Sequence, residues 1–157
     1  MEDRMTITLT SSAFSEGAAI PRRHACNGDN LSPALSWKKS FMAVKSYALI
    51  VEDPDAPSGT FVHWVLFNIP PDRDQLPEGI AVAPDIAGIG RQGLNEAQTQ
   101  GYYGPCPPPG RSHRYCFNIF AIDRILELPA DCSAVQLRQV MQSHLLDSGS
   151  LMGTYQR

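Results

Sequence analysis

Two neighbouring segments, residues 46–52 and 61–69, carry apolar side chains at both odd and even positions. A strand that is exposed on one face alternates apolar and polar residues, so this pattern predicts strands that are buried on both faces. Only residues 53–60 separate the two segments, which leaves no room for a helical crossover. We therefore expect an antiparallel pair inside a sheet.

Residues 111–122 have the same apolar character and predict a third buried strand. The period of two along a strand places His113 and Tyr115 on one face. In the second strand, the same period places His63 on a face with Val65, Phe67 and Ile69. A histidine is therefore predicted in two of the three buried strands.

Weaker patterns predict the remaining elements. Residues 5–9 indicate an edge strand, residues 31–37 a short extended piece, and residues 151–155 a last strand. Residues 132–147 predict a helix, with an N-cap at Asp131 or Ser133 and a C-terminal stop at Gly149. Its apolar face would consist of Ala134, Leu137, Val140, Met141, His144 and Leu145.

Residues 70–109 have no clear period and are rich in Gly, Pro, Asp and Gln. A long segment of this kind inside a compact domain is usually a functional or flexible loop. It ends in residues 101–110, where prolines and glycines stiffen the chain directly before the third strand.

Composition supports a mainly β fold, since 13 prolines and 12 glycines in 157 residues favour many turns and short strands. We expect one domain over residues 1–157. The net charge of −3 argues against the positive field of a nucleic-acid-binding protein. No stretch approaches the roughly 18 apolar residues that span a membrane, so we expect a cytoplasmic protein. The four cysteines have no Cys-x-x-Cys spacing, and free thiols are the default in that compartment.

His63 and His113 each follow a proline-stiffened corner, which suggests one shared pocket. Its candidate lining is Asp53, Asp55, His63, His113 and Tyr115, with backbone N–H groups from Gly104 to Cys106 and from Gly110. Imidazoles and a phenol can donate hydrogen bonds, loop amides can form a nest, and a carboxylate can orient a histidine. Such a set suits a phosphate monoester or a similar anion and needs no cofactor. Alternatively, the aspartates cap a tight turn and His63 is a core histidine.

Four segments resemble the signatures of the phosphatidylethanolamine-binding protein family, also called the Raf kinase inhibitor protein family. They are Asp53-Pro-Asp-Ala-Pro57, Val62-His-Trp64, Gly104-Pro-Cys-Pro-Pro108 and His113-Arg-Tyr115. Residues 27–33 and Trp37 are similar to the upstream segment of that family. The match runs in order from about Thr8 to Tyr155, and the short chain looks most like the bacterial and archaeal branch.

This resemblance implies a β-sandwich of two antiparallel sheets with Greek-key connections and a small anion pocket at one end. By position, Asp53, His63, His113 and Tyr115 would line the pocket, and the backbone around Cys106 and Pro107 and the ring of Pro57 would shape it. The implied ligand is phosphate or a phosphoethanolamine headgroup. Members of the family are associated with phospholipid binding and with inhibition of kinases or proteases, which implies a binding protein rather than an enzyme.

The chain departs from the animal branch at three places, so the animal kinase partners do not carry over. Cys106 stands where a glycine is usual, the loop from Pro108 to His113 is one residue shorter, and Phe61 replaces a tryptophan at the rim. The resemblance also places Cys26 and Cys106 near the same end of the sandwich. They could form a regulatory disulfide there, which a Cα separation above about 7 Å would exclude.

Three other functions are compatible with the sequence. A hydrolase would use Cys106 as nucleophile, His63 or His113 as base and Asp53 as orienter, although Pro107 lacks the N–H that an oxyanion hole often uses. A metal site would use two histidines and a carboxylate, but neither histidine has a ligand at a familiar spacing. In a pure interaction module, the surface of residues 70–101 would dock a partner.

Overall fold

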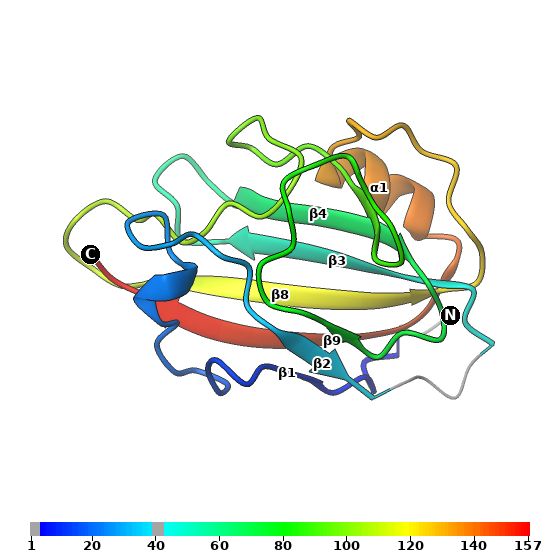
Figure 1. The fold of residues 1–157 in the computed structure, drawn as a ribbon, viewed down its shortest axis with the longest axis horizontal. Coiled ribbons are helices and arrows are strands. Elements are labelled where there is room, and N and C mark those ends of the chain that lie inside the picture. Colours follow the sequence, from blue (N-terminus) through cyan, green and yellow to red (C-terminus); the bar gives the residue numbers. More distant parts are fainter. Residues whose placement is uncertain (1–3, 39–42) are drawn as a thin grey trace.

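The computed structural model describes residues 4–38 and 43–157, which form two antiparallel sheets and one short α-helix. The larger sheet has the order β6-β7-β4-β3-β8-β9, and the smaller has the order β1-β2-β5. Figure 1 shows β4, β3, β8 and β9 running side by side. The elements are β1 (Leu9–Thr10), the 3-10 helix η1 (Arg22–His24), β2 (Leu35–Trp37), β3 (Ser46–Asp53), β4 (Phe61–Ile69), β5 (Gln75–Leu76), β6 (Asp85–Ile86), β7 (Gly90–Gln92), β8 (His113–Ile122), α1 (Ala134–Met141) and β9 (Leu145–Tyr155).

The three predicted central strands are confirmed as β3, β4 and β8, and β3 pairs antiparallel with both of the others. Their two faces are covered by different partners. One face packs against the smaller sheet through residues such as Leu49, Trp64 and Phe117, while the other packs against α1 through Ile50 and Val65. Burial on both faces explains why apolar residues occupy both parities of these strands.

The sheet contains a Greek key, because β7, β4, β3 and β8 lie side by side in that order. To reach its place beside β3, the chain must return from β7 through residues 93–112. This connection includes the proline-rich segment of residues 101–110. Figure 1 shows these residues at the end of the sheet toward which β3 points, next to η1. The topology therefore brings the stiffened loop over the ends of the central strands.

Because of a bulge in β4, His63 lies on the opposite face of the sheet from the one predicted. Val51 pairs with Trp64 but Glu52 pairs with Val62, so His63 is an extra residue in the ladder. Val62 packs on the α1 side with Val65 and Phe67, whereas the His63 ring contacts Tyr115 on the opposite side. A second irregularity separates Ile69 from Val65 and Phe67 as well. The prediction that His63 shares a face with these three residues is wrong.

The predicted helix is real but shorter than expected. It begins after Ser133, whose hydroxyl accepts from the Gln136 N–H while the Gln136 side chain accepts from the Ser133 N–H. Ala134, Leu137 and Met141 form its buried face. Residues 145–147 and Gly149 instead belong to β9, which pairs with β8 along almost its whole length. Gly149 is therefore a strand residue and not a helix stop.

The other weakly predicted elements are present, but their bounds differ from those predicted. The first strand is the short β1 rather than residues 5–9, and the extended piece near Trp37 is reduced to β2. Residues 70–109 are not a single loop, since they contain β5, β6 and β7. Among the described residues, no helix has the length and apolar character needed to cross a membrane.

Candidate functional site

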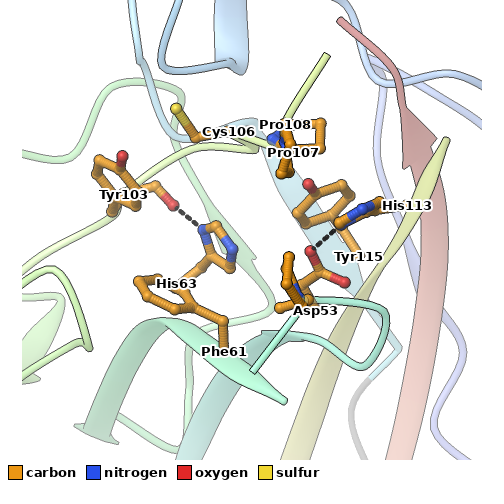
Figure 2. A pocket seen from close by; sticks show the side chains of 11 residues that line it. Asp53, Phe61, His63, Tyr103, Cys106, Pro107, Pro108, His113 and Tyr115 are labelled. Atoms are coloured by element: carbon orange, nitrogen blue, oxygen red, sulfur yellow. Dashed lines mark hydrogen bonds and ion pairs between the residues drawn. The ribbon is translucent and has the colours of Figure 1, made fainter. Parts of the chain in front are cut away.

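A small cavity of about 220 Å³ lies where the end of β3 meets the beginnings of β4 and β8. Because β3 is antiparallel to both neighbours, its last residue lies beside their first residues. The proline-rich connection covers this end and forms the opposite wall (Figure 2). The cavity is lined by Asp53, Ala56, Pro57, Phe61, His63, Tyr103, Cys106, Pro107, Pro108, His113 and Tyr115.

Asp53 and His113 form a buried pair on one side of the cavity. The distance from His113 Nδ1 to Asp53 Oδ2 is 2.7 Å, and both residues are less than 5% exposed. The other carboxylate oxygen accepts the Asp55 backbone N–H at 2.7 Å. Because a carboxylate accepts, Nδ1 of His113 carries the proton. The proline corner thus holds Asp53, and Asp53 orients the ring of His113.

His63 lies opposite this pair, with its Nδ1 2.6 Å from the carbonyl oxygen of Tyr103. The two rings are stacked, with centroids 5.7 Å apart. A carbonyl oxygen can only accept, so Nδ1 is protonated and Nε2 of the neutral ring is an acceptor. Burial lowers the pKa of His63, although the Tyr103 carbonyl acts in the opposite direction. The neutral ring is therefore favoured.

The hydroxyl of Tyr115 is buried at the cavity near the Asp53 carboxylate and the Cys106 backbone, and it makes no hydrogen bond of standard length among the described residues. Tyr115 is 1% exposed, and its ring contacts His63 edge-on with centroids 5.3 Å apart. Burial, followed by the nearby Asp53 carboxylate, raises the pKa of Tyr115 far above its usual value. The phenol consequently stays protonated, and it can donate to the nearby Asp53 carboxylate or to a ligand in the cavity.

Three of the predicted contributors do not line the cavity. The Asp55 carboxylate is turned to Arg114, accepting from its guanidinium at 2.8 and 2.9 Å and from its backbone N–H. The Gly104 N–H donates to Asn30 Oδ1, and the Gly110 N–H donates to the Arg157 carbonyl. These two amides are thus engaged within the protein and do not form the expected nest. The remaining predicted residues, Asp53, Pro57, His63, Cys106, Pro107, His113 and Tyr115, lie together around the cavity.

Tyr103 is the main contributor that sequence reasoning missed, together with Ala56 and Pro108. Its carbonyl fixes the tautomer of His63 and its ring packs on the same imidazole. The only sequence signal was its place in the stiff segment before Gly104. A backbone carbonyl carries no residue-type signature, so its role could be found only in three dimensions.

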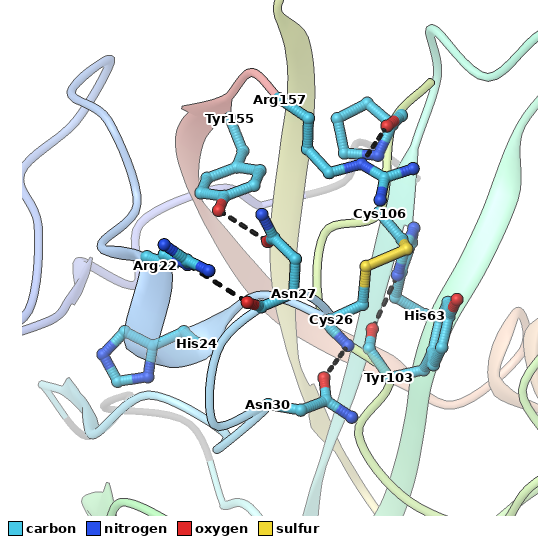
Figure 3. Close-up of a disulfide and its surroundings, with 12 residues drawn as sticks. Arg22, His24, Cys26, Asn27, Asn30, His63, Tyr103, Cys106, Tyr155 and Arg157 are labelled. Atoms are coloured by element: carbon cyan, nitrogen blue, oxygen red, sulfur yellow. Dashed lines mark hydrogen bonds between the residues drawn. A yellow bond between two sulfur atoms is a disulfide. The ribbon is translucent and has the colours of Figure 1, made fainter. Parts of the chain in front are cut away.

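A disulfide joins Cys26 to Cys106 at the edge of the cavity (Figure 3). The Cα atoms are 5.3 Å apart, within the range for a disulfide, so the hypothesis of this pairing passes its geometric test. The expectation of free thiols is wrong for these two cysteines and holds for Cys116 and Cys132. While the bond is intact, Cys106 has no thiol to act as a nucleophile.

The site therefore combines one buried phenol donor, one neutral imidazole and one buried carboxylate–imidazole pair in a space too small for a large ligand. Within residues 4–38 and 43–157, no three His, Cys, Asp or Glu side chains are grouped closely enough to hold a metal ion. The arrangement can bind a small polar ligand that both accepts and donates hydrogen bonds.

This fold and site define a class of protein that has been seen before. A chain from Chlamydia trachomatis, described as a homologue of the phosphatidylethanolamine-binding proteins, superposes with a TM-score of 0.87 at 39% identity, covering 96% of this chain and 97% of its own. Escherichia coli YbcL, described as a member of the mammalian family of the same name, also gives a TM-score of 0.87, at 27% identity and with 96% and 98% coverage. The fold is thus the mainly β, two-sheet fold of that family.

Sequence comparison agrees with the structural likeness. The family model "Phosphatidylethanolamine-binding protein" matches residues 10–156. A UPF0098 protein of Methanothermobacter thermautotrophicus is 43% identical over 151 residues, which cover 96% of this chain and 99% of the relative. The chain belongs to the phosphatidylethanolamine-binding protein family, with similar proteins in both archaea and bacteria.

Proposed function

We propose that the cavity binds a phosphate monoester, such as free phosphoethanolamine or a phosphoethanolamine headgroup, without chemically changing it. The observation that carries this proposal is the buried Tyr115 hydroxyl, a donor at a small cavity that makes no hydrogen bond of standard length to the described residues. A buried donor of this kind is costly unless a ligand or water accepts from it. Phosphate oxygens are strong acceptors that would satisfy it.

The acceptors of the site support a ligand that also carries protons. Nε2 of neutral His63 accepts, and the Asp53 carboxylate is close to the Tyr115 hydroxyl. A monoprotonated phosphate or a ligand ammonium would donate to such groups, whereas a fully ionised phosphate would first require His63 to take up a proton. A cavity of about 220 Å³ is below the range of roughly 300–1,000 Å³ typical of drug-sized ligands, which favours a headgroup over an acyl chain.

We also propose that ligand binding serves to regulate a partner protein, such as a kinase or a protease, in keeping with the family. The surface of residues 70–101, which connects to the cavity wall through Tyr103, is the part of the chain we expect such a partner to contact. A role as hydrolase is disfavoured while Cys106 is bonded to Cys26, since the nucleophile is then absent.

The test is calorimetric titration of the oxidised protein with inorganic phosphate and with phosphoethanolamine, repeated on Tyr115→Phe. A hydrogen bond to a charged group contributes about 1.5–3 kcal/mol, so the loss of the hydroxyl should weaken binding roughly tenfold to a hundredfold. Turnover of phosphoethanolamine, followed as released phosphate, should be absent.

Tyr155→Phe is the matched control, because its hydroxyl bonds to Asn27 at 2.7 Å and lies outside the cavity lining. It should retain the affinity of the wild type. If neither anion binds, or if Tyr115→Phe and Tyr155→Phe bind alike, the proposed function is wrong.

A further inference from the structure

The Cys26–Cys106 disulfide lies at the edge of the ligand site and not in the core. Cys106 lines the cavity, whereas Cys26 belongs to the neighbouring segment that follows η1. Both cysteines are partly exposed residues, so the bond lies near the surface of the protein. Figure 3 shows the disulfide joining the crossover to the segment after η1. The bond therefore connects the cavity wall to a segment 80 residues away in sequence.

Among the described residues, the hydrogen bonds that hold the wall after Cys106 come from Gln156 and Arg157. Pro105, Pro107, Pro108 and Pro109 have no N–H to donate, so backbone hydrogen bonding is sparse in this stretch. The Pro107 carbonyl accepts from Arg157 Nε at 2.6 Å, the Gly110 N–H donates to the Arg157 carbonyl at 3.2 Å, and the Gly110 carbonyl accepts from the Gln156 side chain. The disulfide adds a covalent link between this part of the wall and the segment after η1.

The segment before Cys106 has anchors that do not depend on the disulfide. The Gly104 N–H donates to Asn30 Oδ1 at 2.8 Å, and the Cys26 N–H donates to the Pro105 carbonyl at 3.0 Å. The Tyr103 N–H also donates to the His63 carbonyl at 3.0 Å. Breaking the S–S bond would thus loosen the wall from Cys106 onward while the rest of the crossover stays docked.

We propose that the Cys26–Cys106 disulfide is a redox-sensitive clamp that sets the affinity of the cavity for its anion. The oxidised form holds Cys106 and Pro107 in place, and the reduced form stays folded with a looser wall and weaker binding. A cellular dithiol would supply two electrons and two protons, becoming a disulfide itself while Cys26 and Cys106 become thiols. This inference rests on the anion site proposed above.

The experiment compares phosphate affinity in the oxidised and reduced wild-type protein, with dithiothreitol as reductant and thiol alkylation with mass spectrometry to verify each state. Since a preorganised site binds more tightly, we expect the dissociation constant to rise on the order of tenfold on reduction and to return on reoxidation. Circular dichroism should show the β signal unchanged in the reduced protein.

Cys26→Ser should bind with the affinity of the reduced wild type and should not respond to dithiothreitol. Cys116→Ser is the matched control, because Cys116 is a free cysteine outside the cavity lining and the variant keeps the disulfide. It should respond to the reductant as the wild type does.

Equal affinity in the two states, or unfolding on reduction, would overturn the clamp and leave the anion site intact. Failure of the oxidised protein to bind phosphate or phosphoethanolamine would overturn the anion site, and the clamp with it.

Discussion

Gly104 lies where the proline-rich crossover packs against the segment after η1, and it leaves no room for a side chain. A Cβ atom at this position would lie 2.2 Å from the His24 carbonyl oxygen and 2.7 Å from Asn30 Oδ1. The His24 oxygen cannot easily move away, because it also accepts from the buried Tyr102 hydroxyl at 2.8 Å. In Gly104→Ala the two segments must therefore separate by about 1 Å to reach ordinary contact distances.

The cost follows from two contributions. Overpacking of a tight contact costs about 1–3 kcal/mol, and loss of the Gly104–Asn30 hydrogen bond adds about 0.5–1.5 kcal/mol. We expect a loss of about 2–4 kcal/mol in the free energy of unfolding. For a domain of this size, that corresponds to a fall in Tm of roughly 5–15 °C. The anion affinity should fall as well, since the cavity wall moves with Gly104.

Thermal unfolding followed by circular dichroism measures the effect. Asn30→Gly is the control, because it removes the acceptor and leaves the packing at Gly104 unchanged, while glycine tolerates the φ of +56° found at Asn30. It should cost about 1 kcal/mol, less than Gly104→Ala. A Gly104→Ala protein as stable as the wild type would refute the close packing of the two segments.

Two further predictions concern charge at the site. Burial lowers the pKa of His63 in the free protein, and a bound anion would raise it. The affinity for an anion should therefore be highest at low pH, where His63 is protonated. It should decline as the pH rises from the His63 pKa of the free protein to that of the complex. Sulfate is the suitable probe, because its charge is constant between about pH 5 and pH 8. The dependence of sulfate affinity on pH should become flat in His63→Gln. A flat dependence in the wild type would contradict the role of His63 in anion binding. Asp55→Asn should bind phosphate with an affinity within about twofold of the wild type, because Asp55 pairs with exposed Arg114 outside the cavity. A large loss of affinity in the titration would show that Asp55 contributes to the site.

The sequence was most informative where burial is uniform. The segments that became β3, β4 and β8 could be recognised because continuous apolar runs occur between turn residues, and their antiparallel pairing followed from short connections. The main cavity residues could be predicted because their motifs resemble those of a family whose pocket they would line. Asp53, His63, His113 and Tyr115 do lie together in the structure.

The errors arose where long-range pairing outweighs local pattern. His144 and Leu145 continue the helical spacing of α1, but β8 offers a partner for the chain from Leu145 onward, and a strand forms instead. The period of two failed for His63 because nothing in the local sequence marks the extra residue of a bulge. The engaged amides of Gly104 and Gly110 depend on Asn30 and Arg157, which are distant in sequence.

Because of the bulge in β4, the chemistry of the cavity depends on the number of residues in this strand as much as on their types. A deletion of one residue near Val62 would restore regular pairing and rotate the imidazole toward α1, although every residue of the motif after the gap would be unchanged. Anyone transplanting the pocket onto another β scaffold would have to copy this irregularity together with the side chains.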